Sequence, residues 1–159
     1  MKTAIFFGSA SDADVMKKAA DVFKEFGVSY SAYAVSAHRS PELLAEILQK
    51  LEADGAEVII AGAGLAAHLP GVIASQTLLP VIGVPNSSGG LGGLDALLSI
   101  VQMPKPVPVA TVGVDNAGNA AYLACEIIAL KNPDLKQALI NFRKKTKEDL
   151  AKDGGKVEF

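Results

Sequence analysis

The feature that most restricts how this chain can fold is a long stretch without charge. Between Val58 and Leu94 there is no aspartate, glutamate, lysine or arginine, and only His68 can carry a charge. Such a stretch must lie either in a membrane or inside a protein. Prolines and glycines divide it into pieces of about ten residues, which are too short to cross a bilayer. We therefore expect a buried core, no association with membranes and a cytoplasmic protein.

Short apolar runs alternate with helical patterns along the whole chain. We expect strands at residues 3–7, 29–35, 58–61, 80–84 and 108–114. We expect helices at residues 12–26, 41–53, 66–76 with an interruption near Pro70, 95–101, 116–130 and 134–152. This alternation is typical of a parallel sheet with helices on both faces. The prediction is an α/β fold, a three-layer α/β/α sandwich with an extra C-terminal helix.

Length and composition limit the kind of protein further. The chain has 159 residues, of which 50% are hydrophobic, so we expect one domain over residues 1–159. Its core would span residues 2–130, followed by a helix and tail at 134–159. A net charge of −2 provides no basic surface for nucleic acid. Cys125 is the only cysteine, so we expect a buried thiol, no disulfide framework and no metal site.

In parallel sheets, ligands bind in the loops beyond the carboxyl ends of the strands. The first such loop is GSASD at residues 8–12, where Gly8 leaves the backbone open and Ser9 and Ser11 offer hydroxyls to a phosphate. Ser11 and Asp14 also have the spacing of a helix cap. Asp12 would repel a phosphate but accept hydrogen bonds from sugar hydroxyls. The loop therefore favours a ribose phosphate, with a plain capped helix start as the alternative.

The second loop, VSAHRSP at residues 35–41, joins a helix start to two residues that a helix start does not need. Ser40 and Pro41 suit the N-cap and the first helical position. Arg39 can hold a phosphate or carboxylate in its planar fork. His38 can both give and take a proton near neutral pH. Proton-transfer chemistry at His38 is the functional prediction, and an inert loop histidine is the alternative.

Two further loops have the composition of a pocket wall. AGAGLAAHLPG at residues 61–71 exposes backbone N–H groups that can bind anionic or polar groups. His68 lies early in the expected helix, either as a packed helix histidine or as a site residue. GVPNSSGGLGGLD at residues 83–95 is rich in glycine and predicts a mobile edge of the same pocket. The residues alone thus predict a sugar-phosphate pocket with proton transfer around His38.

Five motifs taken together resemble a known family. GSASD, VSAHRSP, AGAGLAAHLPG, LPVIGVP and LLSIVQMP occur in the order seen in class I N5-carboxyaminoimidazole ribonucleotide mutases, the PurE family of purine biosynthesis. The resemblance covers about residues 2–130. It implies a flavodoxin-like fold, a homo-octamer and a reaction without metal or organic cofactor. In that reaction a carboxyl group moves from the exocyclic N5 to C4 of the imidazole ring, by way of CO2 held in the enzyme.

The resemblance also implies roles for particular residues. The catalytic residues would be His38, as the acid and base, and His68. The substrate-binding residues would be Gly8, Ser9, Ser11, Asp12, Ser36, Ala37, Arg39, Gly62, Ala63, Gly64 and Ala66. The first loop and Arg39 would hold the ribose phosphate, and the glycine-rich third loop would close over the base. Leu65 and Pro106 stand where the family usually has glycine, and residues 86–90 also depart from its pattern.

Two other functions compete with this interpretation. One is the related class II enzyme, an aminoimidazole ribonucleotide carboxylase that uses CO2 directly. Its motifs resemble SAHK and AGRSNALS, so Arg39 and His68 favour class I. The other is a flavodoxin-like domain that binds a ribonucleotide without catalysis. Such a domain would need the phosphate pocket but not the histidine.

Overall fold

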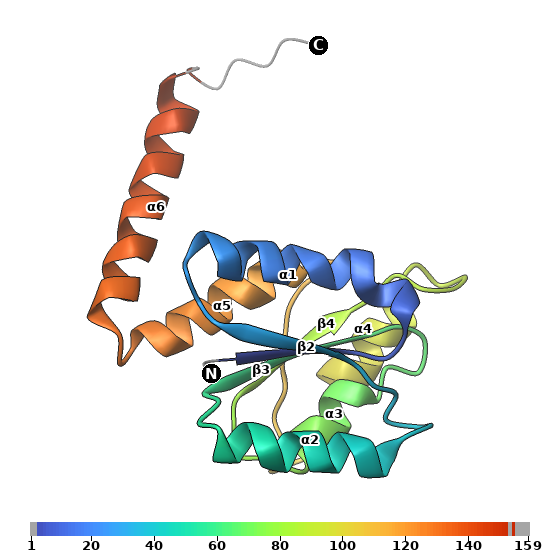
Figure 1. Ribbon diagram of the computed structural model, residues 1–159. Helices are drawn as coiled ribbons and strands as arrows, with labels where there is room; N and C mark the ends of the chain where they lie inside the picture. Colours follow the sequence, from blue (N-terminus) through green and yellow to red (C-terminus); the bar gives the residue numbers. More distant parts are fainter. Residues whose placement is uncertain (1–2, 153, 155–159) are drawn as a thin grey trace.

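The computed structural model describes residues 3–152 and 154 and contains a five-stranded parallel sheet (Figure 1). The strands are β1 (Thr3–Phe7), β2 (Tyr30–Ala34), β3 (Val58–Ala63), β4 (Val81–Pro85) and β5 (Ala110–Thr111). Their order across the sheet is β2-β1-β3-β4-β5, which is the flavodoxin-like order. The predicted α/β fold and its flavodoxin-like sheet are confirmed.

Helices cover both faces of the sheet. They are α1 (Ala13–Glu25), α2 (Pro41–Ala53), α3 (Leu69–Ala74), α4 (Leu94–Val101), α5 (Ala117–Ala129) and α6 (Pro133–Lys152), with a short 3-10 turn η1 (Ala10–Asp12) before α1. Helices α1 and α5 share one core cluster that includes Phe23 and Ile128. Helices α2, α3 and α4 share a second cluster with Leu48, Ile73 and Ile100. The sheet therefore lies between two helical layers, as the sequence predicts.

The uncharged stretch forms the centre of the sheet. Every residue of β3 and β4 is buried, because strands inside a parallel sheet are covered on both faces. Strand β3 runs two residues further than expected, to Ala63. The expected strand at 108–114 is reduced to β5, and Pro108 at its expected start has no N–H group to pair with a neighbour. Within the described residues, every helix is too short or too polar to cross a membrane.

The helix starts differ from expectation in three places. Ser9, not Ser11, caps η1: its side chain accepts from the Ser11 N–H, so the expected cap pair of Ser11 and Asp14 is wrong. Ser40 occupies the N-cap position of α2 without a capping side-chain bond. Pro70 lies in the first turn of α3, so it starts that helix and does not interrupt it.

Helix α6 leaves the body of the molecule (Figure 1). Of its twenty residues, Leu135 and Leu139 are buried. An aromatic cluster also holds it, in which the Phe142 ring lies 5.4 Å from Phe26 and 5.5 Å from Tyr122 between centroids. Apart from Gly154, the tail expected after α6 lies outside the described residues.

Cys125 is buried, as predicted. It lies on α5 with 0% of its surface exposed, inside the core cluster shared by α1 and α5. Burial, and to a lesser degree the Glu126 carboxylate, raises the pKa of the Cys125 thiol to about 11. The thiol is therefore both enclosed and protonated at neutral pH.

Candidate active site

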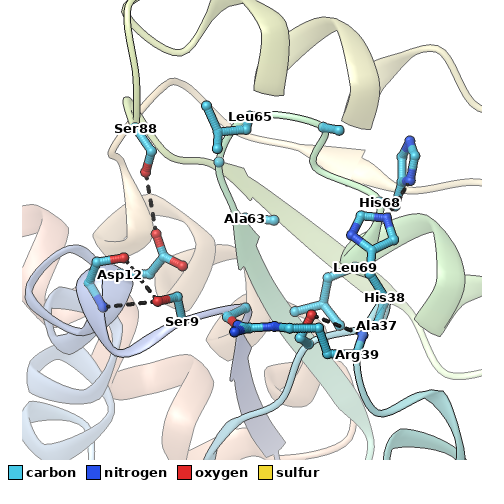
Figure 2. Close-up of a pocket in the computed structure, with 15 residues that line it drawn as sticks. Ser9, Asp12, Ala37, His38, Arg39, Ala63, Leu65, His68, Leu69 and Ser88 are labelled. Carbon is cyan, nitrogen blue, oxygen red and sulfur yellow. Dashed lines mark hydrogen bonds between the residues drawn. The ribbon is translucent and has the colours of Figure 1, made fainter.

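Four loops at the carboxyl ends of β1 to β4 surround an open cavity of about 440 Å³ (Figure 2). Its lining is Gly8, Ser9, Ser11, Asp12, Ser36, Ala37, His38, Arg39, Ala63, Gly64, Leu65, Ala66, His68, Leu69 and Ser88. All the site residues predicted from the sequence are in this lining except Gly62. The fold thus brings together four separate parts of the chain at the edge of the sheet where parallel strands place ligands.

A tight turn after β2 presents His38 and Arg39 to the cavity. The Ser36 carbonyl accepts from the backbone N–H groups of Arg39, at 3.3 Å, and of Ser40, at 3.0 Å. The Ser36 hydroxyl accepts from the Arg39 N–H as well, at 3.3 Å. Helix α2 begins directly after this turn, at Pro41. The backbone is therefore fixed on both sides, while the His38 and Arg39 side chains are exposed.

The two histidines of the chain form a pair. Nε2 of His38 lies 2.7 Å from Nδ1 of His68, and the rings are inclined at 78° with their centroids 4.8 Å apart. A hydrogen bond between two imidazole nitrogens requires that one carries the proton and the other accepts it. This bond orients both rings and leaves the second nitrogen of each ring available to another partner.

The loop before α3 fixes the position of His68. The His68 N–H donates to the Ala66 carbonyl at 2.8 Å, and the His68 carbonyl accepts from Val72 at 2.9 Å. Leu65, just before, has a φ of 55°. Residues other than glycine enter this left-handed region at a cost of about 1–2 kcal/mol. A glycine would adopt this backbone shape without that cost.

The opposite end of the cavity suits an anion. The Arg39 side chain extends toward Ser9 and away from the histidine pair (Figure 2), and its Nη2 donates to the Gly8 carbonyl at 3.3 Å. The Ser11 hydroxyl donates to the Ser9 hydroxyl at 3.1 Å. These groups surround the start of α1, where backbone N–H groups and the helix dipole favour negative charge. A phosphate fits this end of the cavity.

Asp12 lies beside the anion end but is built differently. Asp12 is only 6% exposed, and the Ser88 hydroxyl lies 3.5 Å from its Oδ1 atom. A buried carboxylate repels a phosphate and attracts groups that donate hydrogen bonds. Asp12 is therefore suited to sugar hydroxyls, and its role in binding a ribose stays a prediction.

Gly62 does not reach the cavity. It lies inside β3, and a Cβ atom at this position would stand 2.2 Å from Sδ of Met16. The glycine is therefore needed so that Met16 of α1 can pack on the sheet. The packing of α1 on the sheet is sufficient to explain a glycine at this position.

Three lining residues were not predicted as site residues: Leu65, Leu69 and Ser88. Leu69 is an ordinary apolar residue of α3 in the sequence, and Ser88 is one of several small residues in a glycine-rich loop. Ser88 and Asp12 are 76 positions apart in the sequence, so no local sequence pattern predicts their contact. In the part of the chain that the structure describes, no group of three or more metal-ligating side chains gathers here or elsewhere.

Comparison with known proteins gives a consistent result. A sequence profile described as AIR carboxylase matches residues 2–149. N5-carboxyaminoimidazole ribonucleotide mutase of Pyrococcus horikoshii is 54% identical over 154 residues, 97% of this chain and 87% of the relative. The mutase of the same name from Thermotoga maritima is 48% identical over 157 residues, 99% of this chain and 92% of the relative. Among solved structures, PurE of Treponema denticola has a TM-score of 0.89 and 27% identity, covering 99% of this chain and 98% of that chain.

Proposed function

This chain belongs to the AIR carboxylase family, and from that membership we propose that it is an N5-carboxyaminoimidazole ribonucleotide mutase of purine biosynthesis. The enzyme is an isomerase that moves a carboxyl group from N5 to C4 of the imidazole ring. The structural observation that supports the proposal is the contact of 2.7 Å between His38 and His68, at one end of a cavity whose other end suits a ribose phosphate.

The cavity orients the substrate by its two ends. Arg39, Ser9 and Ser11 bind the phosphate, and Asp12 accepts hydrogen bonds from the ribose. This leaves the aminoimidazole ring toward His38, beside Ala37 and the backbone of residues 63–66, which line the same cavity. Positioning of this kind lowers the barrier because the reacting groups no longer have to find each other in solution.

One histidine is sufficient for the proton transfers. The bond from N5 to the carboxyl carbon breaks and releases CO2 within the cavity, and the electron pair left on N5 takes a proton from His38. C4 of the electron-rich ring then bonds to the CO2 carbon, and the C4 proton returns to His38. The net change moves one carboxyl group to C4 and one proton to N5, so His38 ends the cycle as it began.

His68 supports His38 through their shared hydrogen bond. The bond between Nε2 of His38 and Nδ1 of His68 holds the His38 ring, so the proton exchanged with the substrate is carried on the other ring nitrogen, Nδ1 of His38. The assignment of His38 as the acid and base and of His68 as its partner is part of the proposal.

A steady-state assay with two substrates tests the function. We expect conversion of the N5-carboxy compound to 4-carboxy-5-aminoimidazole ribonucleotide without ATP or added metal. We expect aminoimidazole ribonucleotide with bicarbonate to react far more slowly at the same concentration. Turnover that depends on bicarbonate, with an inert N5-carboxy compound, would instead identify a carboxylase that uses CO2 directly.

We also propose that the enzyme works as the homo-octamer implied by the resemblance. Helix α4 supports self-association, because Leu94, Leu98 and Val101 lie at helical spacing and are 56%, 49% and 50% exposed. Apolar stripes of this kind are normally covered by another surface. Light scattering at micromolar concentration should give the mass of the octamer, and a monomer would contradict the proposal.

A further inference from the structure

We propose that Ser88 is a positioning residue that sets the direction of the Asp12 carboxylate. Through Asp12 it determines how strongly the enzyme prefers a ribonucleotide to the corresponding deoxyribonucleotide. The inference rests on the proposed function, because it takes the ligand to be a ribonucleotide. It starts from the contact of 3.5 Å between the Ser88 hydroxyl and Oδ1 of Asp12 (Figure 2).

The Asp12 carboxylate depends on Ser88 and the ligand for its hydrogen bonds. An ionised carboxylate can accept about four, and a buried one is destabilised when they are not made. Asp12 is 6% exposed, and within residues 3–152 Ser88 is the one side chain that donates to its carboxylate. Its Oδ2 atom lies on the side of Gly8, where a Cβ would come within 3.9 Å of it. Ser88 thus lies at the outer limit of hydrogen-bond distance from one oxygen, and the other oxygen lies toward Gly8.

Ser88 has a fixed backbone on one side. The neighbouring Ser87 donates through its N–H to Oδ1 of Asp115 at 2.9 Å, and through its hydroxyl to Oδ2 of the same carboxylate. Asp115 is itself held, because its N–H donates to the Pro85 carbonyl at 2.9 Å and its carbonyl accepts from Lys18 at 3.3 Å. The 86–93 loop is therefore attached to Asp115 through Ser87, and the next residue, Ser88, lines the cavity.

The third loop leaves room for this inward side chain. A Cβ at Gly64 would stand 2.5 Å from the Ser88 hydroxyl oxygen, so any larger residue there would displace it. Leu65 then covers the following residue, since a Cβ at Gly89 would lie 2.6 Å from Cδ2 of Leu65. The two loops interlock around Ser88, which makes the direction of the Asp12 carboxylate depend on how the 86–93 loop is seated.

The test compares binding of 4-carboxy-5-aminoimidazole ribonucleotide with binding of its 2′-deoxy and 3′-deoxy counterparts, by calorimetry. We expect the wild-type enzyme to prefer the ribonucleotide to at least one deoxy compound. Ser88→Ala should reduce that preference about five- to tenfold, because the carboxylate loses its neutral donor and its fixed direction. Ser88→Gly, which suits this glycine-rich loop, should reduce the preference by a similar factor. Ser88→Thr keeps a hydroxyl and should keep the preference of the wild-type enzyme.

Ser75→Ala is the control, since it removes an exposed hydroxyl that donates to the Val72 carbonyl and leaves the 86–93 loop and the donor to Asp12 in place. We expect it to keep the ribose preference even if it weakens binding of every ligand alike. An unchanged preference in both Ser88→Ala and Ser88→Gly overturns the inference while the proposed function stands. Failure of the wild-type enzyme to bind the ribonucleotide at all overturns both.

Discussion

The two ends of the cavity position their functional groups in different ways. At the sugar end, Asp12 is 6% exposed and is carried by the start of α1 against the sheet. At the other end, His38 is exposed on a turn and His68 is exposed at the N-cap of α3, and each ring is held chiefly by the other at 2.7 Å. A group enclosed by the fold keeps its place through packing, whereas an exposed pair keeps its place through one hydrogen bond. We therefore expect binding and proton transfer to respond separately to substitution.

The largest effect is expected at the histidine end. His38→Asn should lower kcat by about a thousandfold or more, because the acid and base is lost, while ribonucleotide affinity stays close to that of the wild type. Paired measurements of kcat and of binding by calorimetry check this. Turnover like that of the wild type would remove His38 from the mechanism, and a large loss of affinity would mean that the two ends are not separate.

The sugar end should show the opposite pattern. Asp12→Asn should weaken ribonucleotide binding by about 10- to 100-fold, because hydrogen bonds to a charged acceptor are lost, with kcat at saturation nearly unchanged. Asp14→Asn is the matched control, since Asp14 is an exposed carboxylate in the same first turn of α1. An equal loss of affinity in both variants would show that general charge, and not Asp12 itself, is responsible.

His68→Ala should have a smaller effect than His38→Asn. The variant keeps the acid and base but loses the bond that orients it, so we expect kcat to fall by about tenfold. The same kinetic assay with both variants side by side provides the comparison. Equal losses would show that the two histidines have equal roles and that the proposed ranking is wrong.

The smallest effect concerns the backbone beside the histidine pair. Leu65→Gly relieves the left-handed strain at φ 55° but adds freedom to the unfolded chain, so the free energy of unfolding should change by less than about 1 kcal/mol. Leu78→Gly is the control, because Leu78 is an exposed leucine outside the positive-φ residues and should lose stability. Urea denaturation of both variants measures the difference, and equal losses would show that Leu65 carries no strain.

Much of the fold was predictable because buried strands have an apolar, charge-free sequence that is easy to recognise. The charge-free run from Val58 indicates strands covered on both faces, and β3 and β4 are buried throughout. The same reasoning fails for β5, where an apolar run contains prolines that cannot pair. Apolar composition predicts burial, but pairing also needs backbone N–H groups, and Pro108 at the start of the expected strand lacks one.

The site was predictable only where a loop carries its chemistry in consecutive residues. His38 and Arg39 stand together in one turn, so their motif can be recognised. Gly62 was assigned to the site from its place in a motif, although Met16 explains it. Ser88 was missed because its contact with Asp12 exists only after β1 and β4 are assembled in the sheet.

The rate at which Cys125 reacts with a thiol reagent can report local opening of this protein. It is the only cysteine in the sequence, and thiol reagents attack the thiolate, which a pKa of about 11 makes scarce in the native state at pH 8. Labelling must therefore wait until α5 separates from α1 and the sheet. The labelling rate reports how often α5 opens. Comparing this rate with and without ribonucleotide would show whether a bound ligand makes the layer of α1 and α5 open less often, since the start of α1 lies at the cavity.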